Sequence, residues 1–579
     1  MSRTNFGQSD YITPIYSAQY IWAWFSHASG VGLEEIVMGR RSRQPMRSRL
    51  VAALLFGVLT ACSRGGSASA PPPGTLRFDL PADPSSLNPL FEHPDAASVE
   101  QQVARLAFEP FIDLDSSGKA IPALLAVVPT RENGGISADG RTITYHVRPH
   151  VRWSDGVPVT ADDVLYTLHA ILDPRNPVRT HEGYDLIDRA FARGSDTVVV
   201  HLRHTWAPAV MTYFSYGSSA QFVLPAHILR KQEPIAHAAF NASPSVGDGP
   251  YTFVSWQRGE GLKYVANPSY WRGKPAIPTL DVRIATDPST NLLMLQSGAI
   301  DWNLIAPVQA GIVQGKPGLD FRSVPTAVVA GLAFNTSHAP LDDVRVRRAI
   351  AMSIDRAAIS TKVTLGKYPV TNMLQPQFSW AFDPTVRQPS YDARAADALF
   401  RDAGWSRGVD GILRKNGAPL RLVYVQFPES MTGVRVATTV QAALRQRGID
   451  VTVKSVSNAQ LFLPGSRGGT LARGDFDLAY VPYTMGADPD DSSVLACAGT
   501  SNYTRWCNTE VDALERQALS STSQAERRTL YHRIGSIVAR EVPILYLFNA
   551  NYIYAYRERL TGFAPNAFLP TWNAWQWKL

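Results

Sequence analysis

The sequence predicts a mixed α/β protein built from more than one lobe. The chain has 579 residues, and a single hydrophobic core stops growing near about 250–300 residues. Its 41 Gly and 41 Pro residues predict frequent turns. Two helical stretches end at Gly404 and Gly448, and the second leads directly into a strand-like run. Helices that return in this way to strands are typical of an α/β lobe.

Three segments near the start of the folded region have clear patterns. Residues 76–80 (LRFDL) predict a strand, and residues 97–106 predict a helix. Ile143, Tyr145 and Val147 alternate with polar residues, which predicts a strand with one buried face.

A further helix is expected to begin after Thr160, because threonine is a favourable N-cap residue. Asp162 and Asp163 would lie in its first turn, where the helix dipole stabilises negative charge. Apolar residues also recur at helical spacing within residues 340–359.

Composition and charge exclude several classes of protein. Hydrophobic residues make up 45% of the chain and charged residues 18%, which excludes a disordered or fibrous protein. The net charge is +7, and residues 1–62 hold six Arg against three acidic residues, so the remaining chain carries +4. Such a small surplus predicts no nucleic-acid partner.

A secretory signal peptide is predicted over residues 46–62. Arg47 and Arg49 form a short basic region, and an apolar run follows over residues 50–59. This run is too short to remain in a bilayer as a spanning helix. No later segment is long and apolar enough to span a membrane. We therefore expect the folded protein to be extracytoplasmic, in the periplasm or at the cell surface.

The signal ends in Leu59-Thr60-Ala61-Cys62, which resembles a bacterial lipobox. The resemblance implies lipidation of Cys62 and anchoring to the membrane; an unmodified cysteine in an ordinary signal peptide is the alternative. Residues 63–73 would form a flexible tether. Residues 1–45 fit neither a signal nor a domain, and we expect them to be a non-native upstream extension, with translation starting at Met46.

The two other cysteines are Cys497 and Cys507, separated by nine residues in a turn-rich stretch. Outside the cytoplasm, a disulfide between them is expected, and it would contribute about 2–4 kcal/mol. Free thiols or metal ligands are the alternative, but the spacing and the lack of nearby His partners do not match zinc sites.

Several motifs in order resemble the extracytoplasmic solute-binding proteins of family 5, the peptide- and nickel-binding components of ABC importers. They extend over residues 74–579. These motifs are Val151–Val164 (VRWSDGVPVTADDV), Gly247–Tyr251 (GDGPY), Asn267–Gly273 (NPSYWRG), Ser297–Asp301 (SGAID), Phe334–Thr336 (FNT), Pro340–Ala349 (PLDDVRVRRA), Asn502–Tyr503, Arg527 and Val542–Ile544.

The resemblance implies a bilobed periplasmic-binding-protein fold with an additional inserted domain in the first lobe. The lobes would close on a ligand by a hinge motion. The implied boundaries are 74–107, 222–325 and 548–579 for lobe I, 108–221 for the inserted domain, and 326–547 for lobe II.

The resemblance also implies the ligand-binding residues. Family peptide binders hold the ligand backbone as an added strand. One wall would be a loop containing Glu92 and His93. The other would follow the strand at residues 476–480, so that Tyr480 supplies a hydroxyl at the pocket rim, Tyr483 a stacking face and Thr484 a further contact; ordinary half-buried aromatic residues are the alternative for the two tyrosines.

Many relatives place an aspartate after that strand to bind the free ammonium group of a peptide. Gly486 stands at this position here. Asp488 or Asp490 would have to serve instead, although an Asp-Pro turn is an equally good interpretation of this run. Ligand identity and length therefore stay open.

We expect a non-enzymatic, monomeric lipoprotein without cofactor or metal that captures di- or oligopeptides and delivers them to the permease subunits of an ABC importer. No catalytic motif was found that supports an enzyme. A peptide-sensing receptor or chaperone without transport, or a binder of a nickel chelate or another solute, are the alternatives.

Overall fold

The computed structural model describes residues 74–91, 97–217 and 220–579. The predicted upstream extension, signal peptide, lipid anchor Cys62 and tether all lie outside these residues. Within the described part of the chain, no helix is both long and apolar enough to cross a membrane.

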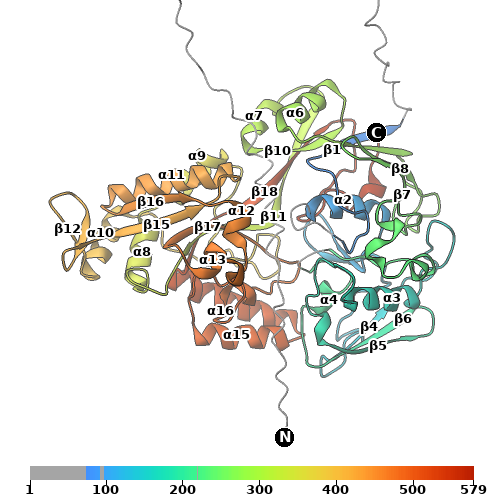
Figure 1. Cartoon of the computed structure of the whole chain (residues 1–579), viewed down its shortest axis with the longest axis horizontal. Helices are drawn as coiled ribbons and strands as arrows, with labels where there is room; N and C mark the ends of the chain where they lie inside the picture. Colours follow the sequence, from blue (N-terminus) through green and yellow to red (C-terminus); the bar gives the residue numbers. More distant parts are fainter. Residues whose placement is uncertain (1–73, 92–96, 218–219) are drawn as a thin grey trace, which may run out of the picture.

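One mixed sheet of ten strands runs through the molecule (Figure 1). Strand β1 is parallel to both of its neighbours, and so is β15, whereas the long strands β11 and β18 are antiparallel to theirs. In spatial order the strands are β16 (Asp450–Ser455), β15 (Arg421–Gln426), β17 (Leu478–Thr484), β11 (Leu319–Phe334), β18 (Ile544–Arg557), β10 (Trp302–Ile305), β1 (Thr75–Leu80), β9 (Thr279–Ile284), β8 (Gly261–Ala266) and β7 (Tyr251–Gln257).

Helices accompany both ends of this sheet (Figure 1). Those beside the β1 end are α2 (Ala97–Ala107), α6 (Pro288–Ser297) and α7 (Ala310–Val313). Those beside the β16 end are α8 (Val344–Met352), α9 (Arg356–Thr364), α10 (Ala393–Asp402), α11 (Met431–Gln446), α12 (Asn458–Phe462), α13 (Thr470–Arg473), α14 (Ser492–Leu495), α15 (Thr509–Ser520) and α16 (Gln524–Glu541). A small sheet in the same half contains β12 (Ser406–Arg407), β13 (Leu413–Lys415) and β14 (Ala418–Pro419).

A smaller unit lies below α2 in Figure 1 and includes a three-stranded sheet in the order β4-β6-β5. Its hydrophobic residues share one continuous core with the β1 half of the large sheet. Its elements are β2 (Ile112–Leu114), β3 (Ala120–Pro122), β4 (Thr142–His146), α3 (Ala161–Leu172), β5 (Ile187–Arg193), β6 (Thr197–Leu202) and α4 (Ala209–Thr212), and α5 (Ala226–Leu229) follows it.

Two large hydrophobic cores divide the molecule into two lobes. The long strands β11 and β18 enter both cores. Along β11 the change of core falls between Val324 and Val328, and along β18 it falls between Ala550 and Tyr554. The strand register between β11 and β18 also shifts after Pro325. The prediction of more than one core is therefore confirmed.

The buried side chain of Asn549 holds the two long strands together at this change of core. Its Nδ2 donates hydrogen bonds to the carbonyl oxygens of Thr326 and Val328, both at 2.9 Å. Its Oδ1 accepts one from the Gln377 N–H at 3.0 Å. Thr326 Oγ1 donates back to the Ala550 carbonyl at 2.9 Å. The side chains thus satisfy backbone groups that the interrupted strand ladder leaves unpaired.

The local sequence predictions agree with these elements. The strand at residues 76–80 and the helix at 97–106 are confirmed as β1 and α2. Ile143, Tyr145 and Val147 are all buried, as their alternation predicts.

The structure also contains helices at both of the predicted helical stretches. Thr160 and Asp163 form a capping box at the start of α3, which confirms the predicted helix start. The helical pattern over 340–359 is split into α8 and α9, because Asp355 caps α9 through the Ala358 N–H.

Replacing Asn549 with alanine should leave the Thr326 and Val328 carbonyls buried without donors. We expect the free energy of unfolding to fall by about 2–4 kcal/mol, since each unsatisfied buried group costs about 1–3 kcal/mol. Urea unfolding followed by circular dichroism measures this change. Asn551→Ala is the control, because the Asn551 amide bonds only to the exposed Ser323 hydroxyl; equal losses in both variants would contradict the role given to Asn549.

Candidate ligand-binding site

The loop that follows β17 carries most of the predicted ligand-binding residues. Strand β17 lies between β11 and β15, so both of its edges are paired, and successive residues from Leu478 to Tyr483 are buried on both faces. After Thr484 the chain leaves the sheet, and the Met485 N–H donates to the Ala327 carbonyl at 2.9 Å. This bond ties the start of the loop to the part of β11 where the two cores meet.

The two tyrosines of β17 are more deeply buried than predicted. Tyr480 has no exposed surface and packs against the Phe427 ring, so it lies inside the lobe II core and not at a pocket rim. Tyr483 is 1% exposed. Its hydroxyl and the Thr484 hydroxyl are buried and have no hydrogen-bond partner among the described residues. Their contact with a ligand stays a prediction.

Asp488 is held by a buried ion pair. Arg527 of α16 donates from Nη1 to Asp488 Oδ2 at 2.7 Å and from Nη2 to Oδ1 at 2.5 Å. The same guanidinium also donates to the Tyr531 hydroxyl at 3.1 Å. Both carboxylate oxygens of Asp488 therefore already have a cationic partner, and the aspartate fixes the loop to α16. Its predicted contact with a ligand stays untested.

Asp490 is engaged within its own loop, where its Oδ1 accepts hydrogen bonds from the Ser492 N–H at 3.0 Å and from the Ser492 hydroxyl at 2.6 Å. The turn predicted at Asp488-Pro489 is present just before it, where the Asp490 N–H donates to Asp488 Oδ1 at 3.1 Å. Gly486, at the position where many relatives have an acid, supplies no side chain.

A pair of buried carboxyl groups lies behind the loop. Asp491 is 3% exposed and Glu515 of α15 is 2% exposed. Gln375 Nε2 donates to Asp491 Oδ2 at 2.9 Å and to the Pro489 carbonyl at 2.7 Å. Burial raises the pKa of Asp491 to about 6, and burial with the charge of Asp491 raises the pKa of Glu515 further above its ordinary value. Asp491 Oδ1 and both Glu515 oxygens have no hydrogen-bond partner among the described residues, so burial disfavours a negative charge on either group.

The loop also contacts the predicted inserted domain. The Ala487 N–H donates to the Tyr216 carbonyl at 3.3 Å, and nearby the Ala207 N–H donates to the Leu519 carbonyl at 2.8 Å. Both bonds join lobe II to the unit that contains β4–β6. The structure therefore has the lobes in contact on this side of the molecule, with the loop enclosed between them.

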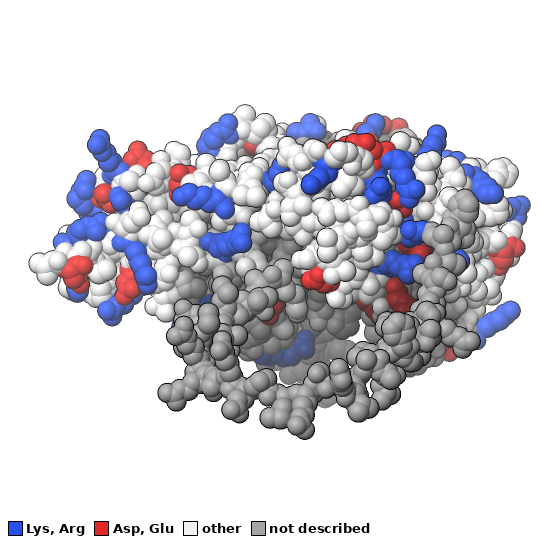
Figure 2. All heavy atoms as spheres, turned by 90° about the horizontal axis from the view of Figure 1, so that it is seen from above, with Lys and Arg blue, Asp and Glu red and all other residues white. Residues whose placement is uncertain are grey.

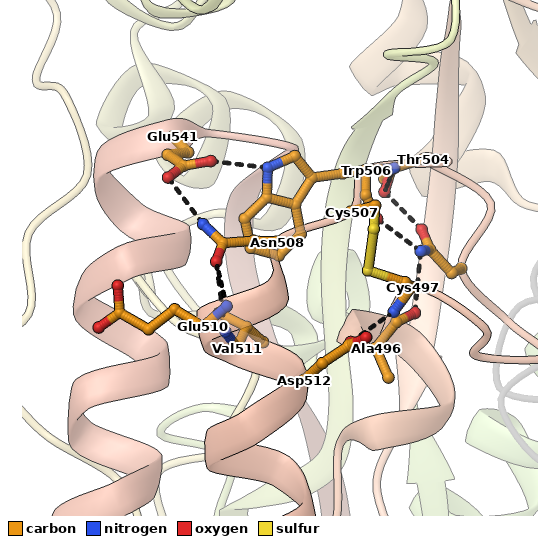
Figure 3. The surroundings of a disulfide bond; sticks show 11 residues. Ala496, Cys497, Thr504, Trp506, Cys507, Asn508, Glu510, Val511, Asp512 and Glu541 are labelled. Carbon is orange, nitrogen blue, oxygen red and sulfur yellow. Dashed lines mark hydrogen bonds between the residues drawn. A yellow bond between two sulfur atoms is a disulfide. The ribbon is translucent and has the colours of Figure 1, made fainter.

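A disulfide bond joins Cys497 and Cys507, the pair predicted from the sequence (Figure 3). Asp512 Oδ1 accepts a hydrogen bond from the Cys497 N–H at 2.8 Å. On the other side, Glu541 accepts bonds from Trp506 Nε1 at 2.8 Å and Asn508 Nδ2 at 3.0 Å. The disulfide thus fixes the end of α14 against α15 and α16, which hold the loop from behind.

Sequence reasoning placed the loop but missed the residues that hold it. Gln375 and Glu515 were not singled out, and Arg527 was noted only as part of a motif. The other predicted wall, Glu92 and His93, lies outside the described residues. Among the described residues, no group of three or more His, Cys, Asp or Glu side chains is arranged to hold a metal ion.

The carboxyl pair predicts a pH-dependent stability. A raised native pKa means that the folded protein binds more protons than the unfolded chain, so this stabilisation is present below about pH 4 and is lost as pH rises through about 6. Asp491→Asn removes this ionisation. The melting temperature of the variant minus that of wild type should therefore be larger at pH 8 than at pH 5. Differential scanning calorimetry measures this difference. The control is Asp475→Asn at an exposed site. An Asp491→Asn effect that is the same at both pH values would refute the raised pKa of Asp491.

Comparison with known proteins identifies relatives in sequence and in structure. Di/tripeptide-binding protein 2 of Pseudomonas aeruginosa is 28% identical over 558 residues, which cover 90% of this chain and 97% of that protein. Among solved structures, AppA from Bacillus subtilis in complex with a nonapeptide has a TM-score of 0.68 at 22% identity and covers 87% of this chain and 98% of its own. NikZ from Campylobacter jejuni in complex with Ni(L-His) has a TM-score of 0.70 at 23% identity and covers 88% and 100%.

These structures share the bilobed periplasmic-binding-protein fold that the sequence predicted. The family model described as bacterial extracellular solute-binding proteins, family 5 (middle region), matches residues 126–505. The two cores, the two strands that pass between them and the loop between the lobes are features of this fold. The chain belongs to the bacterial extracellular solute-binding proteins of family 5.

Proposed function

We propose that this protein is the solute-binding component of an ABC importer, and that it captures peptides between its lobes and delivers them to the permease subunits. The loop after β17 carries the proposal, because it is held rigidly in lobe II and enclosed against the opposite side of the molecule. A di/tripeptide-binding relative that matches 90% of the chain supports the same ligand class.

The domain boundaries proposed are 74–107, 222–325 and 548–579 for lobe I, 108–221 for the inserted domain, and 326–547 for lobe II. The hinge would lie where β11 and β18 change core, beside Asn549. Rotation about these strands would separate the Tyr216–Ala487 and Ala207–Leu519 contacts and open the site.

The loop supports recognition of the peptide backbone in preference to its amine. The buried hydroxyls of Tyr483 and Thr484 have no partner among the described residues. Asp488 is paired with Arg527, and Asp490 is bonded to Ser492. Arg527 thus already neutralises Asp488, Oδ1 of Asp490 is engaged in its own turn, and main-chain hydrogen bonds would supply the affinity.

We further propose that the protein works as a monomer anchored outside the cytoplasm by lipid on Cys62, with residues 63–73 as the tether. Residues 1–45 would then precede the true start at Met46. The lipobox-like sequence before Cys62 supports the lipid anchor, since several acyl chains on one residue hold a protein stably at a membrane.

The proposal predicts that the amino group of a peptide contributes little to binding. Calorimetric titration of the ligand-stripped protein with di- to nonapeptides should show binding, and N-acetylation should change the affinity less than about threefold. Loss of a charged hydrogen-bonded partner would cost more, about 1.5–3 kcal/mol. Asp488→Asn should not change the ratio between acetylated and free peptides, and Asp475→Asn is the matched control.

Two results would contradict the proposal. A loss of affinity of a hundredfold on acetylation would show that an ammonium group is recognised. Binding of a nickel–histidine chelate without binding of any peptide in the series would show a different ligand class.

A further inference from the structure

A groove lies between the two lobes at the top of the molecule in Figure 1, where α6 and α7 face α9 and α11. Its volume is about 550 Å³, within the range of sites for small molecules. Lobe I contributes α6, the segment 306–309 and Ile312, and lobe II contributes Val363 and the first turns of α11. A molecule in this groove would touch both lobes at once.

The lobe I wall exposes large apolar side chains that the fold itself does not bury. Leu293 is 64% exposed, Val308 47% and Ile312 46%. Helix α6 already packs Leu292 and Leu295 into its own core, so Leu293 faces outwards without a packing role. Figure 2 looks onto this side of the molecule and shows a mainly uncharged area near the centre. A clustered apolar surface of this kind is typical of a binding site.

The lobe II wall favours a negative charge. Arg435 is the one charged side chain among the residues that line the groove. It is exposed, and its guanidinium forms no ion pair or hydrogen bond with any described residue. Met431 and Thr432 form the first turn of the 16-residue helix α11, where backbone N–H groups and the helix dipole attract anions. The groove thus combines an apolar wall with one positively charged end.

In Figure 1 the helices that line the groove lie above β11 and β18, whereas α4 and α15 lie below them. The Ala207–Leu519 contact joins the segment just before α4 to α15, so it lies on the opposite side of the two strands from the groove. When two rigid lobes rotate about strands between them, closing one side moves the walls of the other side apart. The groove is therefore widest when the lobes are closed over the loop after β17. A ligand that fits the groove in this arrangement stabilises it.

We propose that this groove is a second binding site, for a small free amphipathic anion such as a medium-chain carboxylate, and that its occupancy favours the closed lobes. The apolar chain lies along Leu293, Val308 and Ile312, and the carboxylate pairs with Arg435. Binding at the groove is independent of the proposed function, whereas its coupling to peptide binding rests on that function.

Calorimetric titration with dodecanoate, without peptide, tests the site. We expect one dodecanoate per chain and weaker binding of the dodecyltrimethylammonium cation. The double variant Leu293→Gln, Ile312→Gln should weaken dodecanoate binding at least about tenfold, and Arg435→Gln should weaken it several-fold. These side chains are exposed, so the fold should be kept. Matched controls are Leu172→Gln, an exposed leucine of the inserted domain, and Arg394→Gln, an exposed arginine of α10, which should bind as wild type does.

Linkage tests the coupling. Saturating dodecanoate should raise the affinity for peptide, and saturating peptide should raise the affinity for dodecanoate by the same factor.

Several results would overturn the proposal: no dodecanoate binding, equal losses in the control variants, or competition between dodecanoate and peptide. A dimer that Leu293→Gln converts to monomer would instead assign the groove to a second copy of the chain. If dodecanoate binds in the groove but no peptide binds, the site stands and the proposed function fails.

Discussion

The passage of the paired strands β11 and β18 from one lobe into the other is the feature on which the rest of the molecule depends. These are the two strands that enter both cores, so they set how the lobes sit relative to each other. Their ladder is interrupted where the core changes, and the Asn549 amide bonds the backbone groups left unpaired there. In the proposed hinge, the ladder on each side would move as part of one lobe, and bending would occur at the bonded break between them.

Buried charge holds the loop between the lobes. The Asp488–Arg527 pair ties it to α16, and Gln375 bonds both the Pro489 carbonyl and the Asp491 carboxyl. A buried ion pair adds little net stability against an apolar replacement, but removing one partner costs about 3–5 kcal/mol. These residues therefore select one loop conformation more than they stabilise the lobe. The disulfide at Cys497 and Cys507 supports the same loop from behind (Figure 3).

Local signals in the sequence predicted local structure well. The helix start at Thr160 and the alternation around Tyr145 involve neighbours in the chain, and the structure confirms both. Tyr480 was placed at a rim because its strand leads to the site, yet the residues of β17 from Leu478 to Tyr483 are buried on both faces. The partners of Asp488 and Asp491 could not be predicted, because Arg527, Gln375 and Glu515 meet them only through tertiary packing.

The identity of the captured solute tests the account most directly. Native mass spectrometry of the protein purified from its own host measures what fills the site, and fragmentation identifies it. The account predicts peptides of mixed sequence, because the proposed recognition is of the peptide backbone. A single metal chelate or a sugar in place of peptides would contradict it.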